Sequence, residues 1–255
     1  MTAPSIALAP AAGPADAPTL VLGPSLGTST LLWEAALPAL ATRFRVLAWD
    51  LPGHGAGPVA RAPFTVGDLA DTVADAVAGP FLYAGVSLGG AVGLELLLRH
   101  PDRVTAAAIV ASGARIGDEQ GWRDRAAQVR AQSTSTLIVP SAQRWFAPAT
   151  MAARPHLTGR MLHVLQDADD ESYALCCDAL AAFDVRDRLG SIEAPVLAAW
   201  GELDAVTPEA SARLIAEGVA RGTAAGIAGA SHLPPVDAPA ATATLLADFL
   251  ERTTP

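Results

Sequence analysis

Short apolar runs recur along the chain, and each is followed by a glycine-rich turn and then by a stretch with helical periodicity. The runs cover residues 18–22, 45–49, 80–86, 106–111, 195–200 and 224–229. Because they do not alternate apolar with polar residues, they are typical of parallel strands buried on both faces. Helical periodicity lies near 30–42, 66–78, 89–99, 208–220 and 238–251. This alternation predicts an α/β fold with an open, mostly parallel central sheet flanked by helices.

The alternation is interrupted once, between the runs that end at residue 111 and begin at residue 195. This interval carries Arg, Gln, Asp and Trp at helical spacing and contains no buried-strand run. A loop of that length without secondary structure is improbable in a folded domain. We therefore predict that residues 116–188 form a helical lid inserted into a core domain made of residues 1–115 and 189–255. The Ala/Pro-rich stretch 9–17 predicts a turn between an N-terminal strand and the first buried one.

The composition excludes several classes of protein. A hydrophobic fraction of 51% and a length of 255 residues fit a folded globular chain rather than a disordered one. All 17 residues in the Lys+Arg count are Arg, so lysine Schiff-base chemistry and the P-loop lysine are excluded. The net charge of −9 argues against a nucleic-acid partner or an anionic membrane surface.

Cysteine usage and the N-terminus indicate a cellular compartment. Cys176 and Cys177 are adjacent, so we expect neither a disulfide framework nor a CxxC metal or redox site. The first ten residues lack the basic region of a signal peptide, and no apolar run approaches the roughly 18 residues that span a bilayer. We expect a cytoplasmic protein, and the pattern favours neither a monomer nor a homo-oligomer.

The most specific motif surrounds Ser87. The residues Gly85-Val86-Ser87-Leu88-Gly89 lie between an apolar run and a helical stretch, and G-x-S-x-G in that context is typical of a nucleophile elbow. A helix that begins there points its N–H groups toward the oxyanion that forms during acyl transfer. A second match, Gly23-Pro24-Ser25-Leu26-Gly27, follows the first buried strand, whereas the nucleophile normally follows a strand two further on. We therefore interpret Ser87 as the nucleophile and Ser25 as part of a loop.

A nucleophilic serine needs a base, and the base needs a carboxylate that orients it. His232 lies in a loop between the last strand and the last helix, where open α/β sheets carry functional groups. His54, in a turn after the second strand, is the alternative base. Among the carboxylates, Asp204 lies just past the run 195–200, and Glu202 is the alternative acid.

Asp50 is interpreted as a residue that braces a turn. The order Ser87, Asp204, His232 along the chain is the order of the triad in the α/β-hydrolase fold. No cluster of His, Cys and carboxylate residues has the spacing of metal ligands, so we expect no metal and no cofactor.

The chain resembles the α/β-hydrolase superfamily and, within it, the 3-oxoadipate enol-lactonases. The broader resemblance rests on the P-G-H-G turn, the elbow, and the loops that contain Asp204 and His232. The narrower one rests on P-S-L-G-T at 24–28, G-V-S-L-G-G-A-V-G at 85–93, G-W-R-D-R-A at 121–126, R-W-F at 144–146, and C-C-D-A-L-A-A-F-D-V-R-D-R-L at 176–189. Three of these motifs fall largely in the predicted lid, where superfamily members differ most.

The resemblance implies a serine hydrolase that opens the ring of 3-oxoadipate enol-lactone, a small anionic lactone, to give 3-oxoadipate. It implies that the backbone N–H groups of Leu26 and Leu88 hold the oxyanion. It also implies that Trp145 forms an apolar wall of the pocket, with a role in the lid core as the alternative. Arg144 is a candidate for binding the substrate carboxylate, with a solvated surface arginine as the alternative.

Other functions fit the same candidate triad. A general carboxylesterase or a hydrolase of carbon–carbon bonds would use the same scaffold, and only the lid motifs favour the lactonase. From a different class, a ligand receptor could keep a hydrolase pocket and turn over little. Because a dehalogenase or an epoxide hydrolase would need a carboxylate where Ser87 stands, we exclude these two activities.

Overall fold

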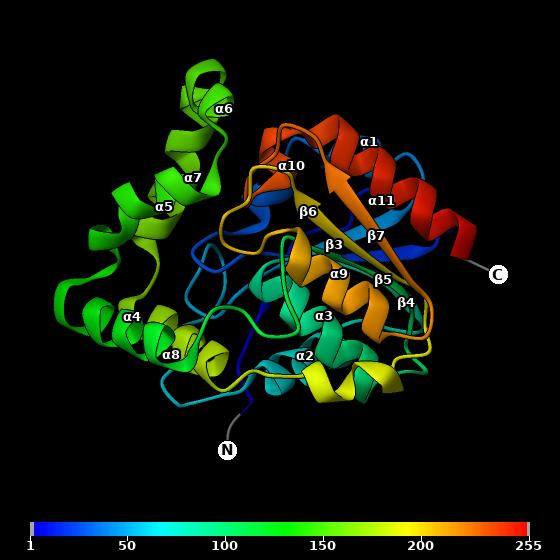
Figure 1. The fold of residues 1–255 in the computed structure, drawn as a ribbon, viewed down its shortest axis with the longest axis horizontal. Helices are drawn as coiled ribbons and strands as arrows, with labels where there is room; N and C mark the ends of the chain where they lie inside the picture. Colours follow the sequence, from blue (N-terminus) through cyan, green and yellow to red (C-terminus); the bar gives the residue numbers. More distant parts are fainter. Residues whose placement is uncertain (1–2, 254–255) are drawn as a thin grey trace.

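A seven-stranded sheet forms the centre of the computed structural model, which describes residues 3–253 (Figure 1). Its strands lie in the order β1-β3-β2-β4-β5-β6-β7; β1 is antiparallel to β3, and all other neighbours are parallel. The strands are β1 (Ala7–Leu8), β2 (Thr19–Gly23), β3 (Arg45–Asp50), β4 (Phe81–Val86), β5 (Val104–Val110), β6 (Val196–Gly201) and β7 (Gly222–Ile227). The predicted α/β architecture with a mostly parallel sheet is confirmed.

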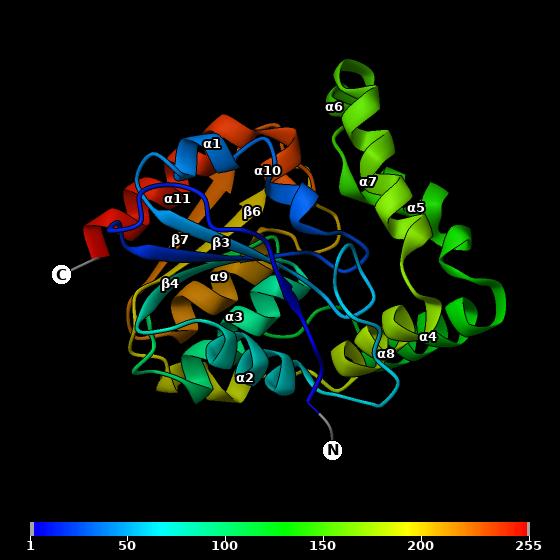
Figure 2. The same cartoon turned by 180° about the vertical axis from the view of Figure 1, so that it is seen from behind.

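Helices cover both faces of this sheet (Figures 1 and 2). One face carries α2 (Val66–Ala76), α3 (Leu88–Arg99) and α9 (Glu209–Gly218). The other carries α1 (Leu37–Leu40), α10 (Pro234–Asp237) and α11 (Pro239–Thr253). Burial on both sides explains why the runs in β2 to β6 are almost wholly apolar. The edge strand β7 is more exposed, in keeping with its glycine and threonine content.

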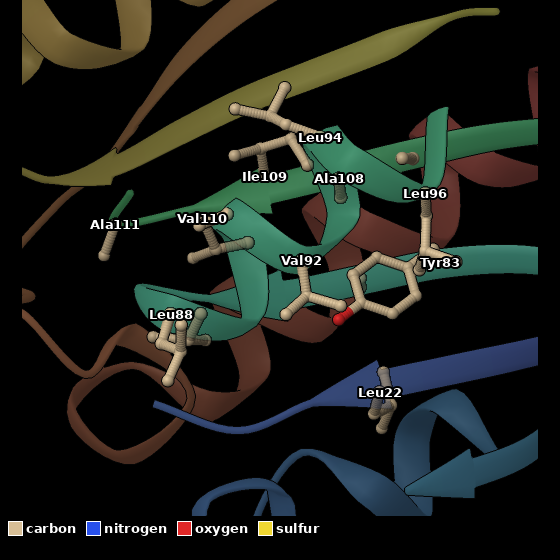
Figure 3. Close-up of a cluster of buried hydrophobic side chains, with 14 of the residues drawn as sticks. Leu22, Tyr83, Leu88, Val92, Leu94, Leu96, Ala108, Ile109, Val110 and Ala111 are labelled. Atoms are coloured by element: carbon tan, nitrogen blue, oxygen red, sulfur yellow. The ribbon is translucent and has the colours of Figure 1, made fainter. Parts of the chain in front are cut away.

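The helix α3 packs most directly against the middle of the sheet (Figure 3). Leu88, Val92 and Leu96, spaced four residues apart, are fully buried. This spacing places them on one side of a helix, which the sheet then covers. The hydroxyl of the buried Tyr83 donates to the carbonyl of Gly89 at 2.8 Å. The first turn of α3 is thereby fixed on β4, next to the candidate nucleophile.

The register of the sheet aligns the turns that follow its central strands. Gly23 at the end of β2 pairs with Gly85 in β4, and Val86 pairs with Val110 at the end of β5. The two G-x-S-x-G turns therefore begin side by side at the carboxyl edge of the sheet, where open α/β folds bind ligands.

One predicted helix is interrupted. The stretch near 30–42 forms a short 3₁₀ helix at Thr30–Trp33 and, after a turn, the single-turn helix α1. Pro38 explains the break, because it has no N–H and its ring would clash with the carbonyl of Glu34 in a continuous helix. The stretch near 238–251 agrees with α11, which the short α10 precedes.

Residues 116–188, which the sequence predicts as a helical lid, are called the lid segment below. Its helices lie beyond the carboxyl ends of the strands, and α4 and α8 pack side by side (Figures 1 and 2). The lid segment contains α4 (Glu119–Gln132), a 3₁₀ turn at Thr134–Leu137, α5 (Ile138–Trp145), α6 (Pro148–Ala153), α7 (Pro155–Asp167) and α8 (Asp170–Ala181). The predicted boundary at residue 188 falls inside a further 3₁₀ turn, Arg186–Ser191. No helix within residues 3–253 is long and apolar enough to cross a bilayer.

Candidate active site

Ser87 occupies a strained turn between β4 and α3. Its φ of 54° and ψ of −114° lie where L-residues are rarely found. The Ser87 N–H donates to the carbonyl of Val110 at 3.0 Å, and the Ser112 hydroxyl donates to the Ser87 carbonyl at 2.7 Å. A Cβ on Gly85 would lie 2.2 Å from the carbonyl oxygen of Gly89, so only glycine permits this approach of strand and helix. The local structure is the one expected of a nucleophile elbow.

The structure brings His232 and Asp204 together from two different loops. His232 Nδ1 lies 2.9 Å from Asp204 Oδ2, and both side chains are almost completely buried. A base whose Nδ1 is bound to a carboxylate presents Nε2 for proton transfer. His232 and Ser87 line the same cavity. At the carboxyl edge of the sheet, the structure thus pairs Asp204 with His232 and places His232 in the wall of the same cavity as Ser87.

Further hydrogen bonds hold the Asp204 carboxylate. Oδ1 accepts from the N–H groups of Val206 at 2.7 Å and Thr207 at 3.2 Å, and Oδ2 accepts from the Thr207 hydroxyl at 2.8 Å. Burial alone would raise the pKa of Asp204, but the hydrogen bond and charge of His232, together with Thr207 and Val206, hold it below its ordinary value. The carboxylate is thus kept ionised, as support for an imidazolium requires.

The predicted oxyanion donors lie in the two adjacent turns. The Gly89 N–H donates to the carbonyl of Pro24 at 2.9 Å, which joins the turn after β2 to the start of α3. Within residues 3–253, the N–H groups of Leu26 and Leu88 donate to no other group of the protein. Both residues are buried, and Leu26 lines the cavity. Two free donors beside Ser87 are what an oxyanion hole requires.

The residues weighed as alternatives hold other positions. Ser25 begins a turn closed by Thr28, whose hydroxyl donates to the Ser25 carbonyl at 2.8 Å. Asp50 accepts from the N–H groups of Thr30 and Ala56 and so braces a turn. Glu202 is exposed.

His54 is fully buried and does not line the cavity that Ser87 and His232 share. Its ring stacks on Tyr173 with 5.9 Å between ring centroids, and its Nδ1 lies 2.8 Å from the Pro52 carbonyl. Burial lowers the pKa of His54 to about 4, against the opposing effects of the Pro52 carbonyl and Asp169. The position of His54 therefore indicates a structural residue at the seam between the sheet and α8.

The cavity beside Ser87 is small and lies between the sheet edge and the lid segment. It has a volume of about 280 Å³, at the low end for ligand pockets. Its wall combines residues from both regions: Ser25, Leu26, Ser87, Ala205, Val206 and His232 from the sheet edge, and Ile116, Gly117, Asp118, Gly121, Trp122, Arg125, Ser141, Arg144, Trp145 and Tyr173 from the lid segment. A compact ligand would contact both regions at once.

Trp145 and Arg144 end α5, and both line this cavity. The Trp145 ring is buried and packs against the turn after β2, where a Cβ on Gly27 would lie 3.2 Å from it. Arg144 is half-buried; burial lowers the pKa of its guanidinium, and the positive charge of Arg125 lowers it further. Trp145 therefore lines the cavity and is also packed in the protein interior. Arg144 is not a solvated surface arginine, because it is half-buried in the cavity wall.

Arg125 is a pocket residue that the sequence reasoning did not single out. It lies over the Trp122 ring, 4.6 Å from the centroid, on the α4 side of the cavity. Within residues 3–253, neither Arg125 nor Arg144 forms an ion pair or a side-chain hydrogen bond with a carboxylate. The one carboxylate of the wall, Asp118, is exposed and caps α4 by accepting from the Gly121 N–H. The lid side of the cavity, as far as residues 3–253 describe it, thus presents two cations without carboxylate partners.

Arg125 does lie within the G-W-R-D-R-A motif, but only the packing of α4 on α8 turns it toward the cavity. Thr207, three residues after Asp204, was also missed, although a hydroxyl at that spacing is a familiar partner for an Asp in a turn. Among residues 3–253, no group of three or more His, Cys, Asp or Glu side chains is arranged to hold a metal ion.

Known proteins are similar to this chain in both sequence and fold. Residues 18–239 match the model of the family described as the alpha/beta hydrolase fold. The chain is 33% identical over 246 residues to 3-oxoadipate enol-lactonase 2 of Acinetobacter baylyi, which covers 94% of this chain and 92% of that protein. The solved structure of the enol-lactonase from Burkholderia xenovorans is similar with a TM-score of 0.91 and 30% identity, over 96% of each chain.

An esterase is also among the relatives. The pimeloyl-[acyl-carrier protein] methyl ester esterase of Neisseria meningitidis is 30% identical over 232 residues, which cover 88% of this chain and 90% of that protein. The chain therefore belongs to the α/β-hydrolase fold family, and these relatives support a hydrolase. The resemblance to enol-lactonases seen in the motifs is confirmed at the level of sequence and fold.

Proposed function

We propose that this protein is a serine hydrolase that opens the ring of a small anionic enol-lactone, with 3-oxoadipate enol-lactone as the substrate. The product is 3-oxoadipate. Ser87 is the nucleophile, His232 the base and Asp204 the residue that orients it. The N–H groups of Leu26 and Leu88 stabilise the oxyanion. No metal or cofactor takes part in these steps.

The observation that carries the choice of substrate is the pair of guanidiniums in the cavity wall. Arg125 and Arg144 line the same small cavity as Ser87 and have no carboxylate partner within residues 3–253. Two half-buried cations that repel each other are stabilised by an anion between them. A lactone with a free carboxylate supplies that anion, and its ring carbonyl is then left for Ser87. The similarity to enol-lactonases over most of the chain supports the same substrate.

In the first half of the reaction, His232 removes the Ser87 proton as the serine oxygen attacks the lactone carbonyl. The oxyanion accepts hydrogen bonds from Leu26 and Leu88, and the His232–Asp204 pair at 2.9 Å stabilises the imidazolium. The ring C–O bond then breaks, and the enol oxygen leaves with a proton from His232. The enol oxygen is a good leaving group because the negative charge that it gains is delocalised, and the released enol then isomerises to a ketone, which opposes ring closure.

In the second half, a water molecule loses a proton to His232 and attacks the acyl-enzyme. Collapse of the second tetrahedral intermediate breaks the Ser87–acyl bond, and Ser87 regains its proton. The overall change is the addition of one water molecule to the lactone.

The test is hydrolysis of 3-oxoadipate enol-lactone, followed by its ultraviolet absorbance. Wild-type protein should turn over the lactone, and Ser87→Ala should lose on the order of 10⁶-fold in kcat with an unchanged melting temperature. Ser112→Ala is the comparison variant: Ser112 follows β5 and donates its hydroxyl to the Ser87 carbonyl, so the change removes a hydroxyl beside the elbow without removing the nucleophile. Undiminished turnover by Ser87→Ala would refute the assignment of the nucleophile.

A general carboxylesterase is the second candidate, and the pimeloyl ester esterase relative favours it. In both functions Ser87, His232 and Asp204 have the same roles. The functions differ only in whether the lid side of the cavity binds the substrate's carboxylate. Turnover of simple aryl esters, dependent on Ser87 but without turnover of the lactone, would establish the esterase in place of the lactonase.

A further inference from the structure

The loop that carries His232 is attached to the lid segment on both sides of the histidine. The Ser231 hydroxyl donates to the carbonyl of Arg144 at 3.1 Å, and the Leu233 N–H donates to the carbonyl of Trp145 at 3.0 Å. These two carbonyls lie at the C-terminus of α5, where a helix has no internal donors left for them. Ser231 and Leu233, the two neighbours of His232, therefore supply the hydrogen-bond donors that a further turn of α5 would have supplied.

Asp237, at the end of α10, completes this attachment. Its Oδ2 accepts from the Ser231 N–H at 2.7 Å, and both of its oxygens lie 3.1 Å from the N–H of Ala147. One carboxylate thus bridges the residue before His232 and the segment just after α5. Asp237 is half-buried, and burial raises its pKa against the hydrogen bonds of Thr150, Ser231 and Ala147.

We infer that Asp237 is a positioning residue for His232. It fixes the position of His232 relative to the part of the cavity wall that the lid segment supplies. Asp204 fixes the ring only at Nδ1, so the direction of Nε2 depends on the backbone at 231–233. That backbone is bonded to the two residues whose side chains line the cavity, Arg144 and Trp145. The base and the substrate wall consequently move as one unit. This inference rests on the proposed function only in that His232 acts as a base on Ser87.

The test replaces Asp237 by Asn. An amide has a single acceptor oxygen, so its NH₂ group replaces one of the two oxygens that face Ala147 and meets that N–H donor to donor, which weakens the bridge without loss of volume. A displacement of the base by about 1 Å costs about 10²-fold in rate. We expect kcat on a neutral aryl ester to fall about 10- to 100-fold with little change in KM. Inactivation by a neutral fluorophosphonate should slow by the same factor.

A spectroscopic signature distinguishes positioning from stability. The proton between His232 Nδ1 and Asp204 should give a far-downfield NMR resonance in the free protein, and Asp237→Asn should shift or broaden it. Asp170→Asn is the matched control: Asp170 accepts from the Thr134 N–H at 2.8 Å, inside the lid segment and away from His232. It should leave kcat and the resonance unchanged.

Ser231→Ala is the second variant, for the case in which Asp237→Asn does not fold. It removes the hydrogen bonds from the Ser231 hydroxyl to the Arg144 carbonyl at 3.1 Å and to the Leu203 carbonyl at 3.5 Å, and we expect a several-fold loss of kcat with a shifted resonance. Unchanged kcat and an unchanged resonance in folded Asp237→Asn, or in Ser231→Ala where Asp237→Asn does not fold, would overturn the inference. Because the aryl ester, the fluorophosphonate and the NMR signal do not involve the lactone, a failure of the proposed substrate leaves this test intact.

Discussion

The two walls of the cavity differ in how completely their polar groups are paired. On the sheet side, the Asp204 carboxylate accepts from His232, Val206 and Thr207, and the two N–H groups predicted for the oxyanion are left free for a ligand. On the lid side, Arg125 and Arg144 line the cavity without a carboxylate partner within residues 3–253. The wall that carries the proposed triad thus has its carboxylate fully hydrogen-bonded before a ligand binds, whereas the lid wall lacks an anion.

This difference separates reaction chemistry from substrate choice. Because the Asp204–His232 pair is already fully hydrogen-bonded, its groups need no rearrangement when charge develops in the transition state. Such preorganised hydrogen bonds are the condition for electrostatic catalysis of acyl transfer in general. Unpaired guanidiniums instead stabilise whichever ligand carries a carboxylate to them. Changes on the sheet side should therefore affect all substrates, and changes on the lid side only anionic ones.

The largest effect is expected on the sheet side. Asp204→Asn keeps the shape of the side chain but lets His232 adopt the wrong tautomer and removes the charge that supports the imidazolium. By comparison with the triad template, kcat should fall about 10⁴-fold on anionic and neutral esters alike. Steady-state kinetics on both substrate types measures this, with Glu202→Gln as the exposed control. A loss of kcat confined to one substrate type would contradict the view that the sheet side carries the reaction chemistry for all substrates.

A smaller and selective effect is expected on the lid side. Arg125→Gln and Arg144→Gln each remove a charged hydrogen bond worth about 1.5–3 kcal/mol, so kcat/KM on an anionic ester should fall about 10- to 100-fold. The neutral ester should be hydrolysed as before. A suitable pair is the para-nitrophenyl monoester of a dicarboxylic acid and its methyl-capped diester. Arg123→Gln, which breaks only an exposed pair with Glu119 on the same helix, serves as control. Equal losses of kcat/KM on both esters would show that Arg125 and Arg144 do not select the substrate.

The smallest effect concerns stability at the seam between the two regions, where His54 stacks on Tyr173. The pKa of His54 is lowered from 6.5 to about 4, so between pH 7 and pH 5 the unfolded chain binds a proton that the folded chain does not. The free energy of unfolding should therefore fall by about 2 kcal/mol from this residue as the pH falls from 7 to 5.

Urea unfolding at pH 7 and pH 5 measures this dependence. His54→Gln should show a fall smaller by about that amount, whereas His163→Gln, at an exposed position, should behave like wild type. If His54→Gln kept the whole pH dependence, His54 would not be a neutral buried residue in the folded protein.

The parallel strands were predictable because each is buried on both faces, which leaves unbroken apolar runs. The run 195–200, for example, became β6 at Val196–Gly201. The meeting of Ser87, Asp204 and His232 was predictable because each follows a strand of the same sheet, and parallel strands end at the same edge. Local motifs and the chain order were enough for this wall of the site.

The lid wall could not be predicted to the same depth. Arg125 and Arg144 stand in motifs that drew attention, yet which arginine faces the cavity depends on the packing of α4, α5 and α8. The Asp237 bridge depends on two backbone N–H groups 84 residues apart, at Ala147 and Ser231, and no side-chain pattern marks them. Positions set by tertiary contacts of this kind leave no periodic signal in the sequence.

The most direct test of the account is a competition between an anionic lactone and its neutral methyl ester in the wild-type protein. Both present the same ring carbonyl to Ser87, and only the anion can pair with Arg125 and Arg144. We predict that kcat/KM for 3-oxoadipate enol-lactone exceeds that for its methyl ester by about tenfold or more. Equal values, or a preference for the methyl ester, would contradict the claim that the lid wall selects an anionic substrate.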